Sequence, residues 1–240
     1  MLLKDLPEIT MPPQSESTPW YAPLWDYLNA EVFTRRPGCK PGQPLFNLYL
    51  SDHPSVDLPG AHLQRRDNLH AYLRFFTASP PLLLVGEAPG WRGARFSGVP
   101  FTSEAQLTRG EVPFDGCQTS AQAAPLHETT AAVYWAALGA YAGQALAWNS
   151  LPFHPHREDD ILSNRTPNLA ELRQHATILS GVIEQVHPRR VIAIGQKASQ
   201  LLREIGFDCL IVRHPAHGGS QQFASQTREI LKDAHGEVYP

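Results

Sequence analysis

The chain has 240 residues and a mass of 26.6 kDa, a size that suits one compact domain. Its formal net charge of −3 excludes a protein drawn to nucleic acid by overall positive charge, so any DNA-binding surface must be local. The sequence has no apolar run of roughly 20 residues that could cross a bilayer, and its N-terminus lacks the apolar core of a signal peptide. We therefore expect a cytoplasmic monomer without a membrane partner.

The cysteines Cys39, Cys117 and Cys209 are far apart and form no C-x-x-C pair. This pattern argues against a disulfide framework and against a zinc knuckle. We expect reduced, structural thiols, and neither a bound metal nor a cofactor.

The N-terminal part, residues 1–60, is rich in Pro, Ser and Gly. It predicts an irregular decoration, with an apolar segment at residues 20–33 that can form a helix. Residues 61–240 carry helix and strand patterns, and we expect them to form the α/β body of a single domain that spans residues 1–240.

Short apolar runs predict buried strands at residues 81–85, 145–149, 190–195 and 209–212. Helical patterns occur at residues 63–76, 128–141, 168–186, 196–205 and 220–234. Asn168 with Glu171 matches a capping box at the start of one of these helices. The alternation predicts an α/β fold, namely a three-layer α/β/α sandwich around a parallel sheet of about four strands.

Three predicted strands end in loops with distinctive polar residues. The first loop, Gly86–Gly90, has the sequence Gly-Glu-Ala-Pro-Gly and continues to Gly-Val-Pro-Phe at residues 98–101. The second begins at Asn149, and the third is Arg213-His214-Pro215. Each loop alone is most often structural. Because the carboxyl ends of parallel strands meet at one edge of a sheet, where ligands bind, we expect the three loops to form one site.

In this order the loops resemble the uracil-DNA glycosylase superfamily, and the resemblance covers residues 81–220. Gly-Glu-Ala-Pro-Gly, Gly-x-Pro-Phe, Asn-x-x-Pro at residues 149–152 and Asn-Arg-Thr-Pro at residues 164–167 are similar to motifs of its iron–sulfur branch. His-Pro at residues 214–215 is similar to the C-terminal His-Pro of the superfamily. The cluster of that branch needs four cysteines, and this chain has three, none in the expected places.

The resemblance implies a monofunctional DNA glycosylase, with DNA as its partner, that flips a damaged base out of the strand and removes it with water in base excision repair. Uracil is the first candidate base. Phe101 would stack on the base, Asn149 would hydrogen-bond to its polar edge, and His214 would donate to the oxygen where negative charge grows. The other substrate-binding residues would be Gly86, Ala88, Pro89 and Pro215.

The residue that activates the water is open between two carboxylates. Superfamily members with Asp in the first loop use it to orient the water, whereas this chain has Ala88 at that position. Glu87 adjoins Ala88. Glu104 follows Phe101 by three residues and would reach the same rim if the chain turns back; otherwise it is a helix N-terminal carboxylate.

The expected contacts to DNA are basic and aromatic residues near the loops. They are Trp91, Arg92, Arg95, Arg213 and His217. For the pair Arg65-Arg66, a solvated surface is a simpler interpretation than a contact with DNA. Many members carry an apolar wedge after the His-Pro, whereas residues 216–222 here contain no Leu, which predicts a divergent member with weaker binding to duplex DNA.

Three other functions remain open. A metal-dependent hydrolase would use His154, His156, Asp159 and Asp160, although a polar surface loop explains these residues more simply. A DNA-binding protein could keep the fold and the pocket without the reaction, which the presence of Ala88 favours. A glycosylase could also act on another lesion, such as a deaminated purine.

Overall fold

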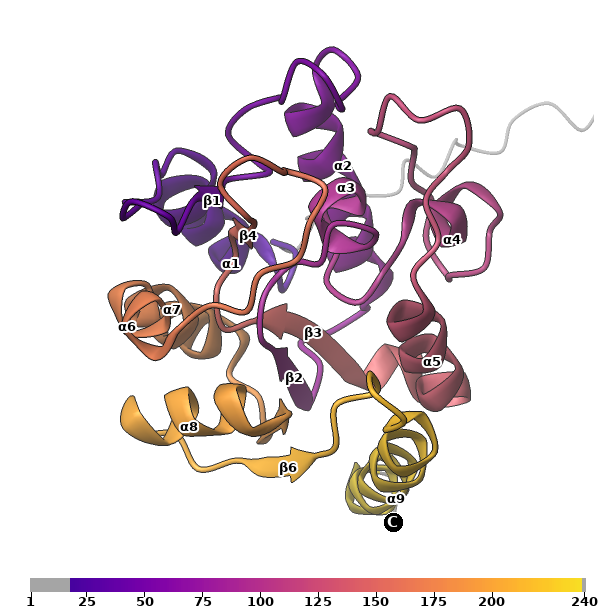
Figure 1. Ribbon diagram of the computed structural model, residues 1–240. Coiled ribbons are helices and arrows are strands. Elements are labelled where there is room, and N and C mark those ends of the chain that lie inside the picture. The colour runs from indigo at the N-terminus through magenta and orange to yellow at the C-terminus, as the bar shows by residue number, and fades with distance from the viewer. Residues whose placement is uncertain (1–17, 239–240) are drawn as a thin grey trace, which may run out of the picture.

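The computed structural model describes residues 18–238, and its centre is a parallel sheet of four strands (Figure 1). The strands are β2 (Leu82–Gly86), β3 (Ala145–Asn149), β5 (Arg190–Ile194) and β6 (Leu210–Val212), in the order β3-β2-β5-β6. Gly86 pairs with Asn149 in the register, so the last residues of β2 and β3 lie side by side. The four predicted strands and their parallel arrangement are confirmed.

Helices cover both faces of the sheet because successive side chains of each buried strand point to opposite faces (Figure 1). Leu82 and Leu84 pack with side chains of α5 (Thr129–Leu138) and α9 (Ser220–Val238). Leu83 and Val85 pack on the other side, among the helices α1 (Ala22–Leu28), α2 (Ala61–Phe75), α7 (Ala176–Val186) and α8 (Gln196–Glu204). These layers confirm the predicted α/β/α sandwich.

Shorter elements connect this framework. They are η1 (Asn29–Phe33), α3 (Ala94–Ser97), α4 (Glu104–Thr108), η2 (Gly139–Gln144) and α6 (Leu169–Gln174). The strands β1 (Leu45–Phe46) and β4 (His154–Pro155) form a separate antiparallel pair. This pair joins the N-terminal part of the chain to the segment that follows β3.

The region expected to be an irregular decoration is more ordered than predicted where the structure describes it. Residues 20–33 contribute α1 and η1, and Leu24, Leu28 and Phe33 are buried in the same core as the sheet. Residues 1–17 lie outside the described part of the chain.

Two predicted helices are shorter than expected. The helix expected at residues 168–186 divides at His175, whose backbone leaves the helical conformation (φ −112°, ψ 10°). The capping box at its start is confirmed, because Asn168 Oδ1 accepts the Glu171 N–H at 3.0 Å and Glu171 Oε2 accepts the Asn168 N–H at 2.9 Å. The helix expected to reach residue 141 ends at Leu138, because Gly139 has a φ of +49°.

Between residues 18 and 238, no helix is both long and apolar enough to cross a membrane.

Candidate active site

A cavity of about 370 Å³ lies at the carboxyl edge of the sheet, where the three predicted loops meet. Glu87, Ala88 and Pro89 come from the loop after β2, and Asn149 from the end of β3. The loop after β6 supplies His214, Ala216 and His217. The lining is completed by Gly90, Ala94, Phe101, Glu128, Thr130, Pro155, Asn164, Arg165 and Thr166.

Phe101 and Asn149 meet at Gly86, beside the cavity. A Cβ atom at Gly86 would lie 2.6 Å from Phe101 Cζ and 2.9 Å from Asn149 Oδ1, so only glycine fits there. Phe101 has a φ of +51°, a left-handed conformation that is rare for a bulky residue. Its ring stacks on Tyr134 of α5, with centroids 4.9 Å apart and an interplanar angle of 18°. This packing fixes a flat apolar surface on the cavity wall.

Asn149 presents an amide without a protein partner. Its side chain forms no hydrogen bond with any residue between 18 and 238, although the residue is only 6% exposed. An amide offers both a donor and an acceptor, so Asn149 can hydrogen-bond to the polar edge of a flat heterocycle on Phe101.

His214 is half-buried, and its ring orientation is fixed by the backbone. The N–H of Ala216 donates to His214 Nδ1 at 3.1 Å, so the neutral ring carries its proton on Nε2. Burial, together with the nearby charges of Arg213 and His217, lowers the pKa of His214. The ring is therefore a neutral N–H donor near pH 7. Gly219 is required beside it, because a Cβ atom there would overlap the carbonyl oxygen of His214.

Glu87 lines the cavity with a carboxyl that forms no side-chain hydrogen bond with the described residues. Burial raises its pKa, and Lys197 partly offsets that effect. The backbone positions this residue, because the carbonyl oxygens of Gly86 and Glu87 accept the N–H groups of Ser150 at 2.8 Å and Leu151 at 3.0 Å. The loop after β2 is thus joined to the loop after β3.

Glu104 does not line the cavity, which removes it as a candidate for the residue that activates water. Its side chain is fully buried. Oε1 accepts the N–H groups of Thr119 and Ser120 at 2.6 and 2.8 Å, and Oε2 accepts the Ser120 hydroxyl at 2.6 Å. Glu104 therefore holds the segment around residues 119–126 in place.

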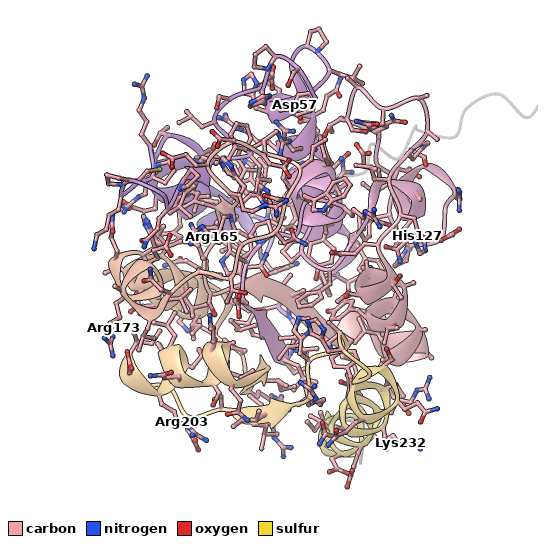
Figure 2. The ribbon with its side chains drawn as sticks, viewed as in Figure 1. Asp57, His127, Arg165, Arg173, Arg203 and Lys232 are labelled. Carbon is pink, nitrogen blue, oxygen red and sulfur yellow. The ribbon has the colours of Figure 1, made fainter. Side chains whose placement is uncertain are left out.

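Arg95 is also wrongly predicted, since it lies in the interior and cannot contact DNA. Its guanidinium donates to both oxygens of Asp57, at 2.7 and 3.1 Å, and lies over the rings of Phe46 and Phe96. Arg65 bonds to the same carboxylate at 3.1 Å and is fully buried, so its expected place on a solvated surface is wrong as well. Figure 2 shows Asp57 near the start of α2, away from the sheet.

The other expected DNA contacts lie at the rim of the cavity or near it. The backbone N–H of Trp91 donates to Asn164 Oδ1 at 2.9 Å, and the Arg92 guanidinium lies 4.7 Å from the Trp91 ring centroid. Arg92, Arg213 and His217 are exposed. His217 lines the cavity and has a φ of +53°.

The segment at residues 154–160 does not form the alternative metal site. Both ring nitrogens of the buried His154 face carbonyl oxygens, of Pro89 at 2.7 Å and of Ile161 at 3.1 Å, and burial lowers its pKa to about 4. Asp160 accepts a hydrogen bond from Arg157 at 2.8 Å. In the part of the chain that the structure describes, no group of three His, Cys, Asp or Glu side chains could hold a metal ion.

Each of the three cysteine thiols contacts a different part of the fold. Cys39 lies against the backbone of Leu45, Cys117 against Asn68, and Cys209 against Ser199.

Glu128 lines the cavity but belongs to none of the sequence motifs. It directly precedes α5, where Ser, Thr, Asp or Asn is the usual helix cap, and its side chain makes no capping hydrogen bond. A long acidic side chain at a cap position was the available signal.

Arg165 also lines the cavity, above the sheet near the middle of Figure 2. Its guanidinium is held by both carboxylate oxygens of Glu171, at 2.7 and 2.8 Å. It is therefore a fixed positive group of the wall.

Comparisons with known proteins agree with this fold. The family model described as the uracil DNA glycosylase superfamily matches residues 73–234. The crystal structure of wild-type SMUG2 from Pedobacter heparinus is similar with a TM-score of 0.62 and 15% identity, over 90% of this chain and 98% of that chain. No curated protein sequence matches the chain. Because the family model covers well over half of the sequence, the chain belongs to the uracil-DNA glycosylase superfamily.

Proposed function

We propose that this protein is a monofunctional DNA glycosylase that removes uracil from DNA by hydrolysis. The observation that carries the proposal is the meeting of Phe101, Asn149 and His214 at one cavity. Together they offer a stacking surface, an amide without a protein partner and a neutral N–H donor. A flipped pyrimidine needs these three features.

The reaction breaks the bond between the sugar carbon and the base nitrogen, and the electron pair of that bond leaves on the base. Stacking on Phe101 and hydrogen bonds to Asn149 hold the flipped base. His214 Nε2–H then donates to the base oxygen that gains negative charge. This donor contributes most in the transition state, where the charge develops.

The attacking water needs a group that orients it and accepts its proton. Ala88 has no side-chain oxygen, and Glu104 is fully engaged elsewhere. We assign the role to Glu87, whose carboxyl adjoins Ala88 and has a pKa raised by burial. The water oxygen bonds to the sugar carbon, its proton passes to Glu87 and on to solvent, and the anionic base takes a proton from solvent.

The exposed residues at the rim supply the contact to DNA. Arg92 and Arg213 would neutralise phosphates on either side of the flipped nucleotide, and Trp91 offers a ring for a neighbouring base. Within the superfamily we place the protein nearest the Gly-Glu-Ala-Pro-Gly branch, without the cluster of that branch, because its cysteines lie apart.

The test is release of uracil from labelled oligonucleotides, in single strands and opposite guanine or adenine. We expect release by the wild type and a loss of on the order of 10²–10³-fold in the single-turnover rate of His214→Ala. His187→Ala is the matched control, since His187 is exposed at the end of α7, next to the amino-terminal end of β5. DNA binding without release would contradict the proposed reaction and favour a binding role. Release of a different base would contradict uracil as the substrate.

A further inference from the structure

Glu128 lines the cavity but does not belong to the loops after β2, β3 and β6. The residue precedes α5, next to His127, which Figure 2 labels at the start of that helix. Its backbone carbonyl accepts the Ala132 N–H at 3.2 Å, but its carboxyl turns away from the helix toward the loop after β2. A Cβ atom at Gly90 would lie 2.8 Å from Glu128 Oε1, and one at Gly93 would overlap Oε2. The two glycines therefore leave the room that this carboxyl occupies.

The Glu128 carboxyl has no partner among the described residues, neither a hydrogen bond nor an ion pair. The contrast with Glu104 is sharp, because the oxygens of that carboxylate are held by backbone and hydroxyl donors. A partly buried carboxylate without a partner is costly, so it is expected to persist only where a ligand or the reaction uses it.

The protonation of Glu128 follows from its surroundings. Burial raises its pKa to about 7, so near neutral pH a large share of the molecules carry the neutral acid with an O–H donor. The charged and titratable groups that line the same cavity are Glu87, Arg165, His214 and His217. Arg165 is paired with Glu171, and burial rather than any of these neighbours causes the shift of Glu128.

The proposed reaction favours the neutral carboxylic acid of Glu128 over the carboxylate. As the base leaves, it becomes an anion inside the cavity. A carboxylate there would repel that charge, whereas a carboxylic acid can donate to it. We infer that Glu128, in its protonated form, is a second hydrogen-bond donor to the leaving base, together with His214. This inference rests on the proposed function.

The first test compares the pH profile of uracil release by the wild type and Glu128→Gln in single turnovers, from about pH 6 to about pH 9. The wild-type rate should fall by about tenfold per pH unit above the pKa of Glu128. Glutamine keeps an N–H donor without titrating, so the variant should be within a few-fold of the wild type at pH 6 and should lack this fall. Glu229→Gln, at an exposed residue of α9, should keep the wild-type profile.

The same rate measurements distinguish failure of the donor role from failure of the proposed function. An active wild type whose profile matches that of Glu128→Gln would overturn the donor role alone. A wild type that releases no base would overturn the proposed function, and the donor role with it.

A second measurement does not depend on the folding of a variant. The Glu128 carboxyl of the wild type is titrated by ¹³C NMR, with and without an oligonucleotide whose 2′-fluoro-deoxyuridine resists cleavage. If the protonated form binds the base, bound DNA must raise the pKa of Glu128. An unchanged or lowered pKa in the complex would overturn the inference.

Discussion

Ionisable side chains in two regions of the molecule differ in whether they have protein partners. In the interior cluster of Asp57, Arg65 and Arg95, one carboxylate accepts hydrogen bonds from both guanidiniums. Burial alone would raise the pKa of Asp57, but the hydrogen bonds and charges of Arg95 and Arg65 lower it. In the cavity, Glu87 and Glu128 lack such partners, and burial raises the pKa of both.

This difference separates structural groups from functional ones. A buried charge with partners on all sides has no capacity left for a ligand, so its effect is on stability and on the position of the loops. A partly buried carboxyl without a partner keeps its donor and acceptor free, and burial raises its pKa. The cluster should therefore respond to substitution in stability, and the cavity in activity.

The largest effect is expected at Asp57. Asp57→Ala leaves the guanidinium of Arg95 buried without its carboxylate and Arg65 with only Asp52, at 3.6 Å, so the free energy of unfolding should fall by about 3–5 kcal/mol. Urea denaturation measures this change in the free energy of unfolding. Glu111→Ala, which removes one partner of an exposed pair with Arg109, is the control and should leave the midpoint nearly unchanged. A small loss for Asp57→Ala would contradict a structural role for the cluster.

Gly86→Ala should reduce activity more than stability, in contrast to Asp57→Ala. The added methyl group overlaps the positions of Phe101 and Asn149, so both must shift within the cavity. We expect the single-turnover rate of base release to fall by on the order of 10²-fold, with a smaller change in stability than for Asp57→Ala. At Gly143 a Cβ atom would meet only Phe75, at 3.9 Å, so Gly143→Ala is the matched control. Unchanged release by Gly86→Ala would show that the cavity adapts.

Most of the fold could be predicted from the sequence because its signals are local. The runs at residues 82–86 and 145–149 are apolar along their whole length, and Asn168 with Glu171 forms a capping box within four residues. The three loops could be joined into one site because parallel strands place their carboxyl ends together. Phe101, Asn149 and His214 were selected because these loops resemble the uracil-DNA glycosylase superfamily, and all three line the cavity.

The errors concern residues whose surroundings come from distant parts of the chain. Arg95 follows the first loop by a few residues, and only the fold shows that Asp57 takes up its guanidinium. Glu104 is close to Phe101 in sequence, but its partners are at residues 119–126. Glu128 belongs to none of the motifs, and its place against Gly90 depends on how α5 packs on the sheet.

The pH dependence of stability sharpens the contrast between the two regions. The pKa of Glu128 in the folded state, about 7, is above its ordinary value of 4.5. Between these two pH values the folded protein binds the proton more tightly than the unfolded chain, so this group lowers stability as the pH rises through that window. Glu128→Gln should therefore raise the urea midpoint relative to the wild type more at pH 8 than at pH 5. Equal differences at both pH values would show that Glu128 is solvated.

The smallest effect is expected at the rim. Arg213 is exposed and has no ion pair with any residue between 18 and 238, so Arg213→Ala should leave stability unchanged. Binding to DNA should weaken, and the slope of log affinity against log salt should decrease by about 1, as expected when one phosphate contact is lost. Arg203→Ala is the control, because Arg203 is exposed near the end of α8 and does not line the cavity. Equal slopes for the two variants would place the DNA away from the loop after β6. Proportional losses of binding and of base release in Arg213→Ala would instead show that this rim serves mainly to hold the strand while the cavity residues act on the base.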